Sequence, residues 1–325
     1  MNRSWRRRDV LGSALAAGAL SGCRRATGPA PMVSIVRARG YSEDLGGKVL
    51  DLLREHRVEV RGKRVLLKPN LVEFDPGKSI NTHPLVVRAA FDAFRSLGAA
   101  EVRIAEGPGH RRNTRELAEG AGYDGAFPRF DSLFTDLNLD EVSRVKLARP
   151  FSRLRELYLP QTVLGADLIV SLPKMKTHHW VGATLSMKNF FGLVPGSVYG
   201  WPKNVLHWAG IDECIADLHT VFPRHFAIVD GIVGMDGNGP IQGKLKPAGV
   251  LVGGRDLVAV DATCCRIMQV NPSKVRYLQL AEDRGQIDFR NVRQIGESIA
   301  SVQTAFDLIP EWRSLRLPAE TGTNT

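Results

Sequence analysis

From Met32 onward the chain alternates short apolar stretches with longer amphipathic ones, and this alternation constrains its fold more than any other feature. Residues 65–67 and 168–172 have the length and composition of buried strands. Residues 84–97 begin with Pro84 and end just before Gly98, which predicts a helix. The alternation favours an α/β fold with a mostly parallel sheet flanked by helices. One large domain and two lobes around a central cleft are both compatible with it.

The composition sets the size of this unit. The chain has 325 residues, of which 43% are hydrophobic and 24% are charged, as in ordinary globular proteins. We expect the α/β domain to span residues 33–310, after a short linker at 24–32 that contains Gly and Pro. Residues 311–325 are interpreted as a C-terminal tail, with its last residues disordered.

The first 23 residues have the pattern of an export signal. Arg7 and Arg8 stand just ahead of an apolar run at 10–20, which is too short to span a bilayer. The pair resembles a twin-arginine motif, and the Leu-Ser-Gly-Cys step that ends at Cys23 resembles a lipid-attachment site. This interpretation implies passage through the twin-arginine (Tat) export machinery. It also implies a lipid-anchored protein in the periplasm or on the outer cell surface. The alternative is a plain secretory signal that is rich in arginine and happens to contain a cysteine.

The charge balance indicates the kind of partner. The net charge is +10, and residues 1–22 contribute four Arg and one Asp to it, which leaves +7 for the remainder. This modest excess suits an anionic small molecule or an anionic membrane surface. We expect no nucleic-acid partner, because no stripe of Lys and Arg interleaved with aromatic residues is present.

The cysteines restrict the cofactor. With Cys23 assigned to lipid, Cys214, Cys264 and Cys265 remain, and none of them forms a C-x-x-C pair. An iron–sulfur cluster held within this chain is therefore excluded, as is a cysteine-rich zinc site. Cys264 and Cys265 follow an apolar helical pattern, so we expect them to be buried. The identity of any cofactor stays open, with a divalent metal as one candidate.

Polar residues gather where the expected strands end. Lys68 and Asn70 leave the first buried strand. Ligands of open α/β sheets bind beyond the carboxyl ends of the strands, so both residues are candidate ligand-binding residues. Thr82 and His83 stand immediately before the Pro84 helix, where free N–H groups favour an anion. The alternative is that one of them simply caps the helix.

The densest basic segment follows the strand at 168–172. It contains Lys174, Lys176 and the pair His178-His179, and it continues to Lys188 and Asn189. These residues predict a cationic pocket that holds carboxylate or phosphate groups, or that depresses the pKa of one lysine by mutual repulsion. A basic surface loop is the alternative. Adjacent histidines in an extended segment point to opposite sides, so we expect at most one of them to be a ligand.

Two aspartates are candidates for a metal site. Asp230 closes an expected strand, and Asp236 stands before Gly237, Asn238 and Gly239. The carboxylates suit a hard cation, although the segment has fewer ligands than an EF-hand loop. Asn238 either binds a ligand or forms part of a tight turn.

Several of these motifs, in this order, resemble one prokaryotic family, the "domain of unknown function 362" family. They are Leu67-Lys68-Pro69-Asn70, Thr82-His83-Pro84, the segment 172–178, Ser186-Met187-Lys188-Asn189, and the glycine-rich segment from Asp230 to Pro240. The resemblance covers roughly residues 33–300. Many family members carry an appended ferredoxin-like cassette, which implies redox work. This chain lacks the cluster cysteines, so the resemblance implies a separate electron-transfer partner. The Thr82-His83-Pro84 and Gly107-Pro108-Gly109-His110 steps are also similar to the amino-terminal domain of nickel-pincer lactate racemases, which suggests a related fold and pocket.

Three functions stay open at this point. The first is an enzyme that depends on a cofactor or a metal, with oxidoreductase or isomerase-like chemistry on an organic anion. The second is a lipoprotein that binds an anion or a metal without chemistry, and the third is a structural lipoprotein. For the first, the candidate catalytic residues are Lys176, His178, Lys188 and His83. The candidate ligand-binding residues are Lys68, Asn70, Thr82, Lys174, Asn189 and Asn238, with Asp230 and Asp236 as candidate metal ligands.

Overall fold

The computed structural model describes residues 29–318 of the chain. The export signal and Cys23 lie outside the described residues, as do most of the linker and residues 319–325 of the tail. The packed part of the chain extends beyond residue 310, because Pro310–Leu315 forms a 3-10 helix (η4) with Leu315 buried. Residues 311–317 of the expected tail therefore belong to the folded domain.

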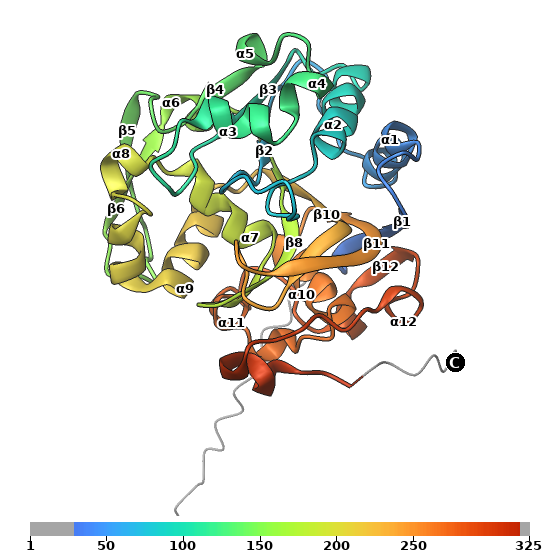
Figure 1. Cartoon of the computed structure of the whole chain (residues 1–325). Helices are drawn as coiled ribbons and strands as arrows, with labels where there is room; N and C mark the ends of the chain where they lie inside the picture. Colours follow the sequence, from blue (N-terminus) through green and yellow to red (C-terminus); the bar gives the residue numbers. More distant parts are fainter. Residues whose placement is uncertain (1–28, 319–325) are drawn as a thin grey trace, which may run out of the picture.

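Ten strands of the described chain form one mixed sheet, which agrees with the one-domain alternative (Figure 1). The order along its main path is β12-β1-β11-β10-β7-β2-β3-β4, with β8 attached to β10 and β9 attached to β8. The neighbours β10-β7, β7-β2, β2-β3 and β3-β4 are parallel, whereas β11 runs antiparallel to both β1 and β10. The prediction of a mostly parallel sheet flanked by helices is confirmed. The strands are β1 (Met32–Arg37), β2 (Arg64–Pro69), β3 (Glu101–Glu106), β4 (Phe134–Asp136), β7 (Leu168–Leu172), β8 (Lys174–His178), β9 (Gly182–Thr184), β10 (His225–Asp236), β11 (Lys244–Gly254) and β12 (Arg293–Gly296). A separate antiparallel pair consists of β5 (Val142–Lys146) and β6 (Glu156–Pro160).

Helices cover both faces of the sheet, and each face has its own apolar cluster. In Figure 1, α1 and α2 lie on one side of the sheet and α10 and α11 on the other. No helix among residues 29–318 is long and apolar enough to cross a bilayer. The α-helices are α1 (Leu45–Glu55), α2 (Pro84–Ser96), α3 (Thr114–Gly120), α4 (Tyr123–Ala126), α5 (Phe130–Leu133), α6 (Gln161–Leu164), α7 (Ser186–Asn189), α8 (Gly196–Tyr199), α9 (Asn204–Val221), α10 (Leu257–Ile267), α11 (Arg276–Leu280) and α12 (Ile299–Val302). The shorter 3-10 helices are η1 (Phe190–Leu193), η2 (Pro272–Lys274), η3 (Phe289–Asn291) and η4.

Helix ends follow the local sequence. Helix α2 begins with Pro84 at its first turn, and the preceding His83 accepts a hydrogen bond from Leu85 N–H. Gly98, just past its end, has φ of +86°, a conformation that glycine adopts without strain. Helix α10 is capped by Asp256, whose carboxylate accepts from Ala259 N–H. These caps fix where α2 and α10 begin relative to the strands before them.

The parallel strands β2 and β3 place their carboxyl ends at the same edge of the sheet. Lys68 and Asn70 leave β2 there, and Glu106 is the last residue of β3. Strand β8 begins directly after β7 and carries Lys176 toward the same edge. This arrangement brings together polar groups that are far apart in the sequence.

Candidate functional site

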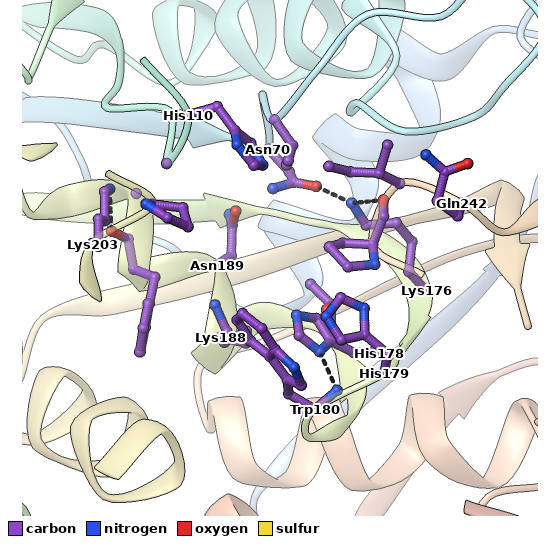
Figure 2. Close-up of a pocket in the computed structure, with 18 of the residues that line it drawn as sticks. Asn70, His110, Lys176, His178, His179, Trp180, Lys188, Asn189, Lys203 and Gln242 are labelled. Atoms are coloured by element: carbon purple, nitrogen blue, oxygen red, sulfur yellow. Dashed lines mark hydrogen bonds between the residues drawn. The ribbon is translucent and has the colours of Figure 1, made fainter. Parts of the chain in front are cut away.

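A cavity of about 810 Å³ lies beyond the carboxyl ends of β2 and β3 (Figure 2). Strand β8, helix α7, the start of α9 and the start of η4 help to form its walls. The basic residues among its described lining outnumber the acidic ones, which are Glu106 and Glu311. The basic residues are Lys68, Lys176, Lys188, Lys203, His110, His178, His179 and His207. Most of the basic residues predicted to form a pocket therefore line one cavity in this structure.

The floor of the cavity is a buried ion pair. Lys68 Nζ lies 2.7 Å from Glu106 Oε2, and both side chains are 1% exposed. The Glu106 carboxylate also accepts hydrogen bonds from Leu71 N–H and Gly107 N–H. Burial lowers the pKa of Lys68, and the negative charge of Glu106 opposes that shift. The sequence analysis omitted Glu106, although it follows from the strand-end argument that identified Lys68.

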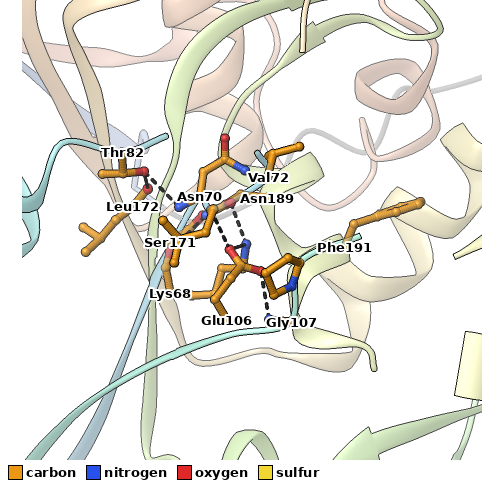
Figure 3. Close-up of polar contacts among 12 residues, drawn as sticks. Lys68, Asn70, Val72, Thr82, Glu106, Gly107, Ser171, Leu172, Asn189 and Phe191 are labelled. Carbon is orange, nitrogen blue, oxygen red and sulfur yellow. Dashed lines mark hydrogen bonds and ion pairs between the residues drawn. The ribbon is translucent and has the colours of Figure 1, made fainter. Parts of the chain in front are cut away.

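Asn189 forms hydrogen bonds both to Lys68 of this pair and to Ser171 on the neighbouring strand β7 (Figure 3). Its Oδ1 accepts from Lys68 Nζ at 2.7 Å, and its Nδ2 donates to Lys68 O and to Ser171 Oγ. Gly192 lies against the same group, where a side-chain carbon would overlap both Glu106 and Lys68. A glycine is therefore required at this position because of the close approach rather than the backbone conformation.

Lys176 is fully buried and surrounded by neutral acceptors. Its Nζ donates to Asn70 Oδ1 at 2.7 Å and to Ile80 O at 2.8 Å, with Pro240 O at 3.4 Å. Burial shifts the pKa of Lys176 well below its ordinary value, and the nearby Lys174, Lys188 and Lys68 add to that shift. Asn70 thus lines the cavity as predicted, and it also positions Lys176.

Lys203 is a cavity residue that the sequence analysis missed. It adopts a left-handed conformation with φ of +67°, just before α9. Its Nζ donates to Gly107 O and to Phe191 O, each at 2.6 Å, and burial lowers its pKa to about 7. A lysine between Pro202 and Asn204 at the start of a helix has no pattern that distinguishes it from an exposed lysine.

Lys188 differs from the other three lysines. Its Nζ lies 3.7 Å from the centroid of the Phe191 ring, over the ring face. Among residues 29–318, we find no hydrogen-bond acceptor and no ion-pair partner for this amine. Burial lowers its pKa to about 7, and repulsion from Lys68 adds to the effect. Figure 2 shows its side chain among the residues around the cavity.

Both adjacent histidines line the cavity, so they do not point to opposite sides as expected, and the expectation that at most one of them is a ligand stays a prediction. They sit at the end of β8 and in the turn after it, where strict alternation no longer applies, and their rings stack at 4.9 Å. His178 Nδ1 accepts from Trp180 N–H at 3.0 Å, so its ring hydrogen is on Nε2. Burial shifts the pKa of His178 well below its ordinary value, which keeps the ring neutral.

His83 and Lys174, two of the predicted site residues, lie away from the cavity. Lys174 Nζ lies 2.5 Å from Asp230 Oδ2, and the two side chains are 1% and 0% exposed. Asp230 also accepts from Tyr41 Oη and from His83 N–H. The His83 ring stacks on Tyr41 with centroids 3.7 Å apart. His83 therefore caps α2, and the predicted roles in catalysis and ligand binding are not supported by the placement of these residues.

Thr82 is likewise internal to the fold. Its Oγ1 accepts from Asn70 N–H at 2.9 Å and donates to Leu172 O at 2.5 Å. These bonds link the segments that follow β2 and β7, so Thr82 positions Asn70 rather than lining the cavity. Asn238, in contrast, lines the cavity beside the turn at Gly237, which has φ of +76°.

The two candidate metal ligands do not come together. Asp230 is bonded to Lys174 and Tyr41. Asp236 accepts a hydrogen bond from Asp307 N–H, and its Oδ2 lies 3.6 Å from Lys246 Nζ. Within residues 29–318 no group of three or more His, Cys, Asp or Glu side chains is arranged to hold a metal ion. Cys264 and Cys265 are free thiols at 0% exposure, as predicted, and burial raises their pKa values.

Comparison with known proteins gives the class of this one. Residues 65–266 match the family described as "Domain of unknown function (DUF362)", which is more than half of the chain. The chain therefore belongs to this family, as its motifs suggested.

Two similar proteins can be named. Thylakoid-associated protein sll1697 of Synechocystis sp. is 30% identical over 233 residues, which are 69% of this chain and 68% of that protein. The lactate racemase apoprotein from Thermoanaerobacterium thermosaccharolyticum is a more distant solved structure, with 13% identity and a TM-score of 0.48. That similarity covers 74% of this chain and 57% of the racemase chain.

Proposed function

We propose that this protein binds an organic anion in the cavity beyond β2 and β3. The observation that carries this proposal is Lys188, a cavity-lining amine without a protein acceptor among the described residues. The Lys188 side chain is only partly exposed, and a cationic group that has lost part of its hydration is stabilised by an opposite charge. A carboxylate or phosphate group of a ligand would supply the missing partner for Lys188.

The charge balance of the cavity supports an anion over a neutral ligand. Glu106 is already committed to Lys68, and Lys176 and Lys203 are held by neutral oxygens. When they are protonated, Lys176, Lys188 and Lys203 therefore have no carboxylate partner among the described residues. A bound anion would strengthen these charges as well, because it would raise each lowered pKa.

The size and walls of the cavity indicate an organic anion rather than an inorganic one. Its volume of about 810 Å³ lies within the range of pockets that enclose cofactors and drug-sized ligands. One wall is aromatic: the rings of Trp180 and His207 have centroids 4.8 Å apart, and Phe191 lies 5.8 Å from His207. An anion with an apolar or conjugated part would fill both regions.

Calorimetric titration of the purified full chain tests this function. The probes are oxalate, succinate, benzoate and inorganic phosphate. We expect carboxylates to bind, and Lys188→Gln to weaken oxalate about tenfold or more because a charge-assisted bond is lost. Lys146→Gln is the matched control, since Lys146 is exposed on β5 and is not among the residues that line the cavity. The proposal fails if none of the probes binds, or if both variants behave like the wild type.

We also propose that the protein is exported and anchored by a lipid on Cys23. This proposal rests on the Arg7-Arg8 pair and on the small residues before Cys23. Growth of an expressing strain with a radiolabelled fatty acid should label the wild type and leave Cys23→Ser unlabelled. Arg7→Lys combined with Arg8→Lys should leave the chain in the cytoplasm. A labelled Cys23→Ser variant would contradict the assignment.

A further inference from the structure

Two lysines of the cavity offer a matched comparison. Lys188 and Lys203 line the same space, and burial lowers the pKa of each to about 7. The Lys203 amine is fixed by hydrogen bonds to two backbone carbonyls, each at 2.6 Å, so it cannot turn toward a ligand without losing them. The Lys188 amine has the Phe191 ring on one side and no acceptor among the described residues. Lys188 is thus the lysine whose nitrogen is free to react.

The charged groups around Lys188 contribute to the low pKa of its amine. They act from several elements, and the positive ones outnumber the negative ones. The positively charged or ionisable basic groups are Lys68 on β2, Lys176 and His178 on β8, and Lys203 and His207 near the start of α9. The acidic groups are Glu106 on β3 and Asp212 on α9. Burial and the neighbouring cations both favour the neutral amine, and the neutral amine is the nucleophilic form.

We propose that Lys188 forms a Schiff base with the carbonyl group of the anionic ligand. The inference rests on the proposed function, since it assigns an aldehyde or 2-oxo group to the same bound anion. The Lys188 nitrogen attacks the carbonyl carbon and a carbinolamine forms. Its hydroxyl then leaves as water, and the amine gives up two hydrogens to yield the imine. No electron donor or acceptor is consumed in this step.

The cavity supplies what this step requires. Lys68 and Lys176 line the same cavity, and their amines attract the carboxylate of a 2-oxo acid when they are protonated. The leaving hydroxyl takes the proton that the Lys188 nitrogen releases, and the neutral His178 ring, with its hydrogen on Nε2, offers a hydrogen-bond donor in the same cavity. The Phe191 ring, over which the Lys188 amine lies, packs beside His207 and places an apolar surface next to an imine at this nitrogen.

Reductive trapping tests the inference. The full chain is incubated with glyoxylate and sodium cyanoborohydride at pH 7, and the modified lysines are located by peptide mass spectrometry. At this pH, a lysine with a pKa near 7 has on the order of a thousandfold more neutral amine than an ordinary lysine. We therefore expect Lys188 to be labelled at least about tenfold faster than exposed Lys146, and oxalate to slow that labelling.

Three comparisons decide the outcome. Lys188→Arg keeps a positive charge but lacks a reactive amine, so it should bind oxalate better than Lys188→Gln and should lose the cavity label. Labelling of Lys203 in place of Lys188, or equal rates at Lys188 and Lys146, would overturn the Schiff-base inference while oxalate binding still supports the anion site. Selective labelling of Lys188 without oxalate binding would instead overturn the anion site and leave the reactive lysine.

Discussion

Two buried lysine–carboxylate pairs of this protein look alike and are set in different surroundings. Lys174 and Asp230 lie inside the packed sheet, 2.5 Å apart. Lys68 and Glu106 lie at the floor of the cavity, 2.7 Å apart. All four side chains are at most 1% exposed. Burial and pairing alone therefore do not distinguish the functional site from the core.

The difference lies in what surrounds each pair. Asp230 is also bonded to Tyr41 and to His83 N–H, and Tyr41 Oη accepts from Lys174, so this cluster is closed by protein groups. The Lys68–Glu106 pair borders a space of about 810 Å³ that Lys176, Lys188 and Lys203 also line. Open space beside a surplus of positive charge, and not a buried charge by itself, marks the candidate site.

The largest expected effect is at the closed pair. Lys174→Met leaves the Asp230 carboxylate buried without its counter-charge, which we expect to lower the free energy of unfolding by about 3–5 kcal/mol. The oxalate affinity of the folded protein should not change. Urea denaturation and calorimetry measure the two quantities. Arg54→Met, which removes an exposed pair with Asp51, is the control and should change stability by less than about 1 kcal/mol.

Lys68→Met is the equivalent change at the cavity, and it tests whether the two ion pairs differ in stability and in anion binding. Lys68→Met should cost less stability, about 2–3 kcal/mol, because water in the cavity can reach Glu106 and the backbone donors to it remain. It should also weaken oxalate binding about tenfold or more, since a cavity cation is lost. The same two measurements apply. Equal oxalate affinity in the Lys68→Met and Lys174→Met proteins would show that the pairs do not differ in function.

Gly192→Ala probes the close approach at the floor of the cavity. The added carbon overlaps Glu106 and Lys68, so the pair must move, and we expect a loss of about 1–3 kcal/mol of stability. Oxalate binding should weaken as well, because Lys68 is displaced. Gly125→Ala, in α4 with no neighbouring atom within 4 Å of the new carbon, serves as the control. A comparable loss of stability in both variants would show that overlap with Glu106 and Lys68 is not the cause of the effect at Gly192.

The smallest effect is a pH dependence of anion binding. An anion binds the protonated Lys188 better, and the pKa of this amine is about 7 before binding. The oxalate affinity should therefore fall about tenfold as the pH rises from 6 to 8. Calorimetry at several pH values measures this slope, which should flatten in Lys188→Arg because arginine stays charged. An unchanged slope in that variant would assign the titration to another group, such as Lys203.

Much of the fold follows from local sequence. Pro84 and Gly98 bracket α2, and Asp256 starts α10, because caps and turns are decided by neighbouring residues. The strand-end argument likewise brings Lys68 and Asn70 to the cavity. The same argument does not distinguish two lysines on one strand. Lys174 and Lys176 are two residues apart on β8, yet Lys174 pairs with Asp230 in the core and Lys176 donates to Asn70 at the cavity.

The rest depends on tertiary contacts. Asp230 suits a metal by its chemistry, and its real partners, Tyr41 and Lys174, are 189 and 56 residues away in the sequence. Lys203 reaches the cavity through a left-handed backbone that no residue type predicts. The pairing of His178 with His179 on one wall depends on where β8 ends, and strand ends are the least predictable part of an element.

The 3-10 helix η4 has a consequence for the order in which the protein is assembled. Trp312 Nε1 donates to His179 O at 2.9 Å, and Ile309, Pro310 and Glu311 line the cavity. One wall of the cavity therefore comes from a segment that leaves the ribosome more than a hundred residues after Lys188. Because domains form as the chain is synthesised from the amino end, the cavity is completed late in translation. A nascent chain that stops before Ile309 lacks the wall that contacts His179.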